Sequence, residues 1–83
     1  MECQSIVAVH IRKRSGDAPD VQEVFTDHGG IIRVRLGVHA TDHPSDEGLI
    51  LLHVCGEEDQ ARRLVDSLNG MDDVHAQMMR LEV

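Results

Sequence analysis

This chain of 83 residues has almost no aromatic side chains, with one phenylalanine and no tryptophan or tyrosine. Nucleic-acid bases therefore have no platform on which to stack. The 15 acidic residues exceed the 8 basic residues and give a formal charge of −7. This charge opposes binding to a polyanion, because nucleic-acid affinity depends largely on Lys and Arg that neutralise phosphates. We do not expect direct nucleic-acid binding.

Long hydrophobic runs are also missing, and the longest is far shorter than the roughly 20 residues needed to cross a bilayer. The start, Met1-Glu2-Cys3-Gln4, lacks the basic flank and apolar stretch of a signal peptide. We expect a cytoplasmic protein with no membrane partner. The two cysteines, Cys3 and Cys55, form no CxxC pair, and a cytoplasmic chain keeps thiols reduced. No disulfide framework is expected.

The small size predicts a single domain over residues 1–83. Its core must be built from aliphatic side chains. Because a single core of this size is only marginally stable alone, association is a common remedy. We expect a homodimer or a higher oligomer.

Apolar periodicity predicts six elements. Alternation with a period of two predicts strands over residues 4–12, 31–39, 48–55 and 73–82. A period of 3.6 predicts two helices, one that follows a polar turn over 13–16, with Asp17 as its cap, and one over 57–69. In the strand over 31–39, alternation places Ile32, Val34, Leu36 and Val38 on the buried face and Ile31, Arg33 and Arg35 on the opposite face.

This order is β-α-β-β-α-β, an α+β sandwich with a four-stranded antiparallel sheet in the order 4-1-3-2 and both helices on one face. The helices can cover only one side of the sheet. The other side would carry exposed apolar residues, and such patches usually mark an interface. The expected members are Ile6, Ala8, Ile31, Leu49 and Leu51. We expect a homodimer that buries this face or extends the sheet at an edge.

The run from Val24 to Gly37, together with the spacing of Leu64, Leu68, Gly70 and Val74, resembles the small regulators of the iron-only hydrogenase system. That family has an ACT-like, ferredoxin-like fold and no named catalytic residue. The chain departs from the family at His39-Ala40-Thr41, where relatives tend to have Pro-Tyr-Arg, and over 65–70, where a Ser-Gly-Lys-Leu-Gly stretch is common.

The resemblance also implies a place for a ligand. ACT-like domains generally bind small effectors, often amino acids, at dimer interfaces near the turn after the first strand. The implied position here is Arg14-Ser15-Gly16-Asp17. The alternative is a turn that needs Gly16 only for its backbone angles.

Arg33 and Arg35 form a second candidate effector site, a positive spot on an acidic protein. Two arginines on one strand face could hold a carboxylate or phosphate by bidentate hydrogen bonds. They could instead pair with acidic residues of a neighbouring strand or subunit.

Six histidines suggest a metal site. In the predicted sheet His10 and His75 are cross-strand neighbours, His39 lies at the same end, and the loop residue His43 could approach them. Imidazoles suit Zn, Ni or Cu(II), and the similar fold of nickel-responsive repressors holds metal with strand residues of two subunits. His53 and Cys55 form a second possible pair. The alternative is a set of surface or interface histidines without metal.

No Ser/His/Asp pattern, phosphate loop or metal signature is present, so we do not expect an enzyme. The sequence favours a small ACT-like regulatory module that senses an effector as a homodimer, without a DNA-binding domain of its own, and acts on a partner protein. The second hypothesis is a Ni or Zn sensor built from the four histidines. The third is a purely structural interaction domain.

Overall fold

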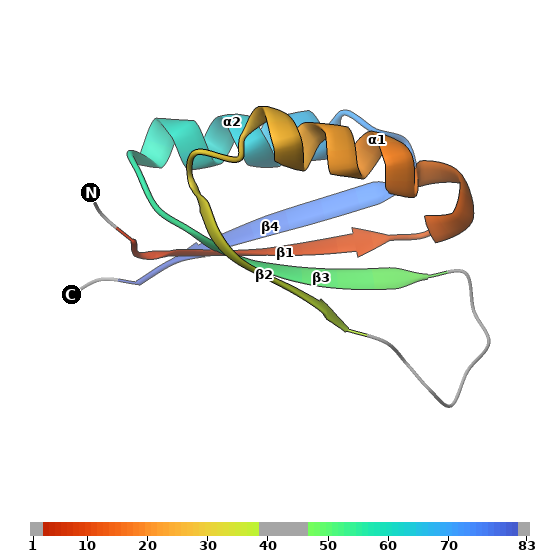
Figure 1. The fold of residues 1–83 in the computed structure, drawn as a ribbon, viewed down its shortest axis with the longest axis horizontal. Coiled ribbons are helices and arrows are strands. Elements are labelled where there is room, and N and C mark those ends of the chain that lie inside the picture. Colours follow the sequence, from red (N-terminus) through yellow and green to blue (C-terminus); the bar gives the residue numbers. More distant parts are fainter. Residues whose placement is uncertain (1–2, 39–46, 82–83) are drawn as a thin grey trace.

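A computed structural model describes residues 3–38 and 47–81 of the chain. The element order is the predicted one (Figure 1). The elements are β1 (Ser5–Ile11), α1 (Arg14–Asp27), β2 (Ile32–Val38), β3 (Gly48–Val54), α2 (Glu58–Asn69) and β4 (Val74–Arg80).

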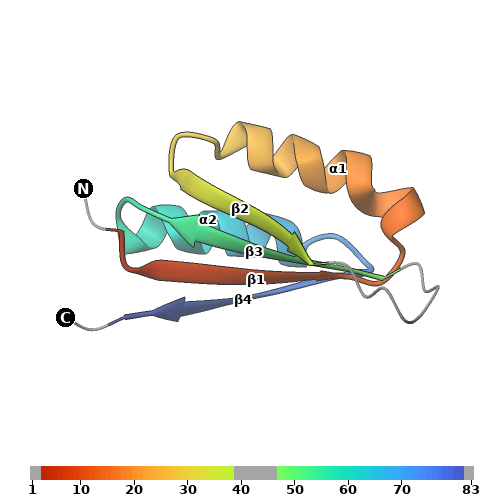
Figure 2. The ribbon, with the colours of Figure 1, turned by 60° about the horizontal axis from the view of Figure 1, so that its bottom comes forward.

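The four strands form one antiparallel sheet in the order β2-β3-β1-β4, which confirms the predicted order. Both helices lie on the same face of this sheet, and the opposite face carries no element in either view (Figures 1 and 2). The chain therefore has the predicted ferredoxin-like fold. None of the helices in the described part is long and apolar enough to cross a membrane.

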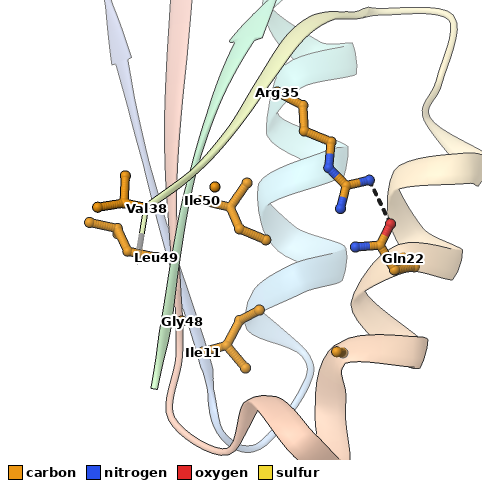
Figure 3. A pocket seen from close by; sticks show the side chains of 9 residues that line it. Ile11, Gln22, Arg35, Val38, Gly48, Leu49 and Ile50 are labelled. Carbon is orange, nitrogen blue, oxygen red and sulfur yellow. Dashed lines mark hydrogen bonds between the residues drawn. The ribbon is translucent and has the colours of Figure 1, made fainter. Parts of the chain in front are cut away.

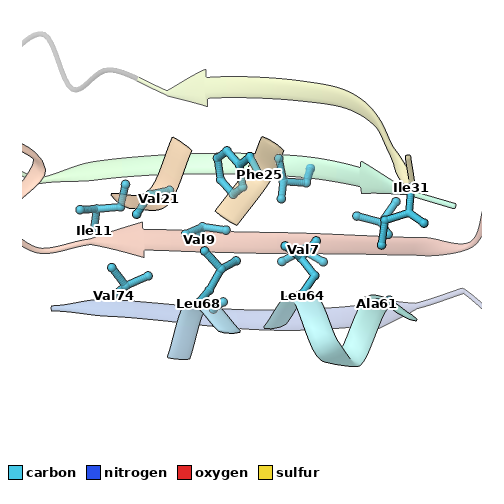
Figure 4. Close-up of a cluster of buried hydrophobic side chains, with 13 residues drawn as sticks. Val7, Val9, Ile11, Val21, Phe25, Ile31, Ala61, Leu64, Leu68 and Val74 are labelled. Carbon is cyan, nitrogen blue, oxygen red and sulfur yellow. The ribbon is translucent and has the colours of Figure 1, made fainter. Parts of the chain in front are cut away.

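The core lies between the sheet and the helices (Figure 4). Alternate residues of β1 supply its centre, since Val7 and Val9 are fully buried and Ile11 is 1% exposed. Leu64 and Leu68 of α2 pack on them as the predicted apolar stripe, and α1 adds its own stripe. These contacts fix which face of β1 points to the helices. Because β3 and β4 pair with β1 residue by residue, their facing is fixed as well.

The first correction concerns the start of α1. The sequence predicted a turn over 13–16 with Asp17 as the cap, but the helix begins at Arg14. The backbone N–H groups of Gly16 and Asp17 both donate to the carbonyl of Lys13, which closes the first turn three residues earlier. Asp17 is thus an acidic residue of the first turn rather than the cap, a position that the helix dipole favours.

The second correction concerns β2. The pairing of β2 with β3 shifts between Ile32 and Val34, so that Ile32 lies opposite Val54 while Val34 lies opposite His53. Such a bulge reverses the facing of every later side chain, because side chains alternate along a strand. The predicted buried residues of β2 beyond the bulge are exposed instead: Val34 (56%), Leu36 (56%) and Val38 (42%). Ile31, predicted to be exposed, is buried.

The third correction is a disulfide between Cys3 and Cys55, where reduced cysteines were expected. Ser5 pairs with Val54, so Cys3, just before β1, and Cys55, just after β3, come together, and their Cα atoms are 3.8 Å apart.

Gly56, which follows Cys55, has a φ of 102°. This backbone angle favours glycine, and a Cβ there would also lie 2.6 Å from Oε1 of Gln60, whose side chain would have to move.

Candidate ligand-binding pocket

The bulge in β2 turns Arg35 toward the helices. Arg35 lies opposite the buried Leu52 in the sheet. Its guanidinium donates a hydrogen bond to the amide oxygen of Gln22 on α1, and its central carbon lies 5.1 Å from the centre of the Phe25 ring. The prediction that Arg35 lies on the outer face of β2 is therefore wrong, because its side chain contacts Gln22 and Phe25 of α1.

Arg35 and Gln22 line a pocket of about 420 Å³ between α1 and the β2–β3 end of the sheet (Figure 3). Figure 3 shows their side chains pointing toward each other across this space, while Val38 and Leu49 point to the other side of the sheet. The remaining walls are mainly apolar and come from Ile11, Ala18, Ile50, Val38, Leu49 and the glycines Gly37 and Gly48. A small ligand could thus meet one cationic group and an apolar surface together.

The pocket exists because glycine stands at two sheet positions that face the helices. Gly37 lies opposite Ile50, and Gly48 lies opposite the buried Ile11. A Cβ placed on Gly37 would meet no atom within 4 Å. A larger side chain at either position would project into the space between sheet and helix.

The guanidinium of Arg35 gives the pocket its chemistry. Arginine presents several N–H donors in a planar fork that matches a carboxylate, and an aromatic neighbour holds the fork in place. Gln22 accepts one of these donors, which orients the group. The described lining contains no carboxylate to neutralise it. The arrangement can therefore bind an anion whose remaining part is apolar.

The predicted effector turn lies beside this pocket. Arg14, Ser15, Gly16 and Asp17 form the first residues of α1, and Ala18, the next residue, lines the pocket. One carboxylate oxygen of Asp17, Oδ2, is buried and has no hydrogen-bond partner among the described residues. Gly16 and Asp17 are not among the described residues that line the pocket.

The candidate metal ligands are placed only in part. His10 and His75 are paired across β1 and β4, as predicted, and Nε2 of His10 lies 3.6 Å from Oε2 of Glu47. His39 and His43 lie outside the described residues. Among residues 3–38 and 47–81, no three His, Cys, Asp or Glu side chains are grouped so as to hold a metal ion.

His53 and Cys55, the second pair that the sequence suggested, do not form a ligand pair. His53 lies toward the other end of β3, where its Nε2 is 3.0 Å from the carbonyl oxygen of Cys3. Cys55 is joined to Cys3 and is buried.

Sequence reasoning missed Gln22, Gly37 and Gly48. The two glycines stand in strands whose other residues are mostly apolar, and an isolated strand glycine is a signal of close approach or open space. That signal was present in the sequence. Gln22 carried no signal, because its role depends on the bulge that brings Arg35 to it.

Comparisons with known proteins agree with this architecture. An uncharacterized protein from Thermotoga maritima has a similar structure, with a TM-score of 0.86 over 99% of this chain and 100% of that chain, at 17% identity. Prephenate dehydratase from Streptococcus mutans is similar with a TM-score of 0.64 and 14% identity, over 93% of this chain but 42% of the dehydratase. No family model and no curated protein matches the sequence. These likenesses show a shared ferredoxin-like fold.

Proposed function

We propose that this chain is a ligand-sensing regulatory module that binds a small amphipathic carboxylate in the pocket between α1 and the β2–β3 end of the sheet. The observation that carries the proposal is the guanidinium of Arg35, held by Gln22 and Phe25 at the wall of a mainly apolar pocket. No catalytic role is proposed for any residue.

The size and charge of the pocket narrow the ligand class. A volume of about 420 Å³ lies near the small end of ligand pockets, which run from roughly 300 to 1,000 Å³. The net charge of −7 disfavours multiply charged anions, since the field of the whole protein repels them. A monocarboxylate with a short branched or cyclic apolar tail fits best, with its carboxylate on Arg35 and its tail toward Ile11 and Ile50.

The lining also bears on whether the ligand carries an ammonium group. Amino acids are the effectors that the family resemblance implies. However, the described lining has no carboxylate for an ammonium, and the amide oxygen of Gln22 already accepts from Arg35. An unpaired cation in such a site is costly. We therefore propose that a carboxylate without an ammonium, such as a 2-oxo acid, binds more tightly than the corresponding amino acid.

A ligand in this pocket would touch both α1 and β2, so binding would change how firmly the edge strand is held against the helix. We propose that a partner protein reads this change, that the module is a cytoplasmic homodimer, and that another chain makes any DNA contact. The resemblance to regulators of the iron-only hydrogenase system supports this role, and the ACT-like fold agrees with it.

Calorimetric titration of the whole chain tests the proposal with two matched ligands, 4-methyl-2-oxopentanoate and leucine, and with leucinamide, which lacks a carboxylate. We expect the 2-oxo acid to bind and leucinamide not to bind. Arg35→Met should weaken binding by about tenfold or more, because hydrogen bonds to a charged group contribute roughly 1.5–3 kcal/mol. Arg33→Met is the matched control, since Arg33 does not line the pocket. Equal binding by both variants would overturn the site.

A second candidate function, metal sensing, is favoured by the direct pairing of His10 and His75 with Glu47 near His10. A complete Ni or Zn site would need further ligands, from His39 and His43 or from a second copy. Elemental analysis of untagged protein and a thermal shift with Ni²⁺ or Zn²⁺ test it, with a His39→Ala/His75→Ala variant and His53→Ala as control. Absence of both bound metal and thermal shift would exclude this function.

A further inference from the structure

The face of the sheet that the helices leave uncovered is more apolar than the sequence predicted. Twelve strand residues, four in each of three rows across β2, β3, β1 and β4, form this surface, which we call the outer face. By register, its rows are Val34, His53, Ile6 and Met79; Leu36, Leu51, Ala8 and Gln77; and Val38, Leu49, His10 and His75. None of the twelve is Asp, Glu, Lys or Arg.

Exposed apolar side chains are concentrated on this face. Six large hydrophobic residues are exposed in the described part of the chain, and five of them belong to the outer face: Val34, Leu36, Val38, Leu49 and Met79. The bulge in β2 places three of these five there. A contiguous apolar patch of this kind on a small domain usually marks an interaction surface.

Both free edges of the sheet carry features that oppose pairing with another strand. On β4, the side-chain amide of Asn69 donates to the carbonyl of Ala76 at 3.0 Å, and its oxygen accepts from the N–H of Ala76 at 2.8 Å. These bonds occupy backbone groups that an added strand would need. On β2, the bulge distorts the other edge, which is a common protection of edge strands. Extension of the sheet at an edge is therefore disfavoured.

We propose that a second copy of this chain covers the outer face, so that two sheets pack face to face about a two-fold axis. A second copy fits because none of the twelve residues is Asp, Glu, Lys or Arg, and the carboxylate of Glu47, just before β3, lies 3.6 Å from His10 at the end of the face. Two chains of net charge −7 can therefore meet at this face with little repulsion. A two-fold contact also requires only that the surface complement itself. This deepens the homodimer of the proposed function and does not depend on the pocket.

The area predicts the strength of the dimer. Four strands spaced about 4.8 Å apart and five residues along each strand cover roughly 320 Å² per copy. The relief of the side chains and the rim raise the buried total to the order of 1,000 Å², at the low end for a specific interface. We therefore expect a weak dimer that dissociates at micromolar concentration, as interfaces at the low end of the size range commonly do.

Sedimentation equilibrium of the whole chain from 5 to 500 µM tests this assignment. The wild type should change from monomer to dimer over this range. Leu36→Glu on β2 and Met79→Glu on β4 should each raise the dissociation constant at least tenfold, and both positions are exposed enough to accept the change without loss of fold. Ser67→Glu, an exposed position on α2, adds the same charge on the helix layer and should leave dimerisation unchanged.

Circular dichroism of each variant tests whether it is folded. A monomeric wild type at 500 µM would overturn the assignment, and so would a dimer that persists in both Leu36→Glu and Met79→Glu, since an edge or the helix layer would then hold it. Carboxylate titration is measured separately. A wild type that dimerises but binds no carboxylate would overturn the pocket and leave the proposed dimer face in place. A wild type that binds the carboxylate but stays monomeric would overturn the dimer face and leave the pocket in place.

Discussion

Replacing Gly37 by valine should weaken ligand binding at least about tenfold without harming the fold. Gly37 faces the helices from β2, two residues beyond Arg35, and lines the pocket. Its added Cβ would meet no atom within 4 Å, and its φ is not in the left-handed region. The added Cβ should therefore cause no clash in the ligand-free protein, so that a loss of binding by this variant tests the pocket specifically.

The magnitude follows from the volume. Valine adds three carbon atoms, and if each fills roughly the 30 Å³ share of one water molecule, the side chain takes about 90 Å³ of a pocket of about 420 Å³. The filled space lies beside the guanidinium that is expected to bind the carboxylate. We expect the dissociation constant for 4-methyl-2-oxopentanoate to rise at least tenfold. The free energy of unfolding should stay equal or rise by up to about 1 kcal/mol, because glycine weakens a strand.

Calorimetry measures the first quantity and urea denaturation the second. Gly30→Val is the matched control: it lies between α1 and β2, its Cβ would also meet open space, and it does not line this pocket. Ligand binding retained by Gly37→Val would refute the placement of the ligand. A loss of stability above about 1 kcal/mol would refute the open space at Gly37.

Three further predictions concern stability. Gly56→Ala should lower the free energy of unfolding by about 1–3 kcal/mol, since φ is 102° and the Cβ would lie 2.6 Å from Gln60. Gly16→Ala, with open space around the Cβ, should not lower it. Equal stability of the two variants in urea would contradict the prediction. Asn69→Ala should lower the free energy of unfolding by about 1–2 kcal/mol, because it removes two hydrogen bonds to Ala76, and Asn69→Asp should be intermediate. An unchanged urea midpoint of Asn69→Ala would contradict this, since water would then replace the amide. Cys3→Ser should cost about 2–4 kcal/mol in oxidising buffer, because a link across 52 positions restricts the unfolded chain. Under reducing conditions wild type and Cys3→Ser should melt alike, whereas equal melting in oxidising buffer would exclude the bond.

The sequence predicted the fold because the apolar pattern of β1 and α2 has one solution. Val7, Val9 and Ile11 alternate with polar or small residues, and Leu64 and Leu68 recur at helical spacing, so burial of both sets fixes which faces form the core. The sheet order then follows from the β-α-β-β-α-β connectivity. The cross-strand pair of His10 and His75 follows from that order. These parts depend on local periodicity and on topology rules.

The pocket could not be predicted because it depends on one inserted residue. In β2, apolar side chains occur on both parities near its start, with Ile31 and Ile32 adjacent, so alternation alone cannot assign the faces. Tertiary packing decides: Ile31 is buried in the core, Ile32 lies opposite Val54, and the bulge that follows brings Arg35 to Phe25. The start of α1 and the pairing of Cys3 with Cys55 likewise depend on contacts that only the folded chain makes.

Titration of 4-methyl-2-oxopentanoate into wild type, Arg35→Met and Arg33→Met is the most direct test of the central claim, that Arg35 holds a small carboxylate between α1 and β2. We predict saturable binding to wild type and Arg33→Met, with affinity at least about tenfold weaker for Arg35→Met. Equal affinities for Arg33→Met and Arg35→Met, or no heat of binding to the wild type at millimolar ligand, would contradict it.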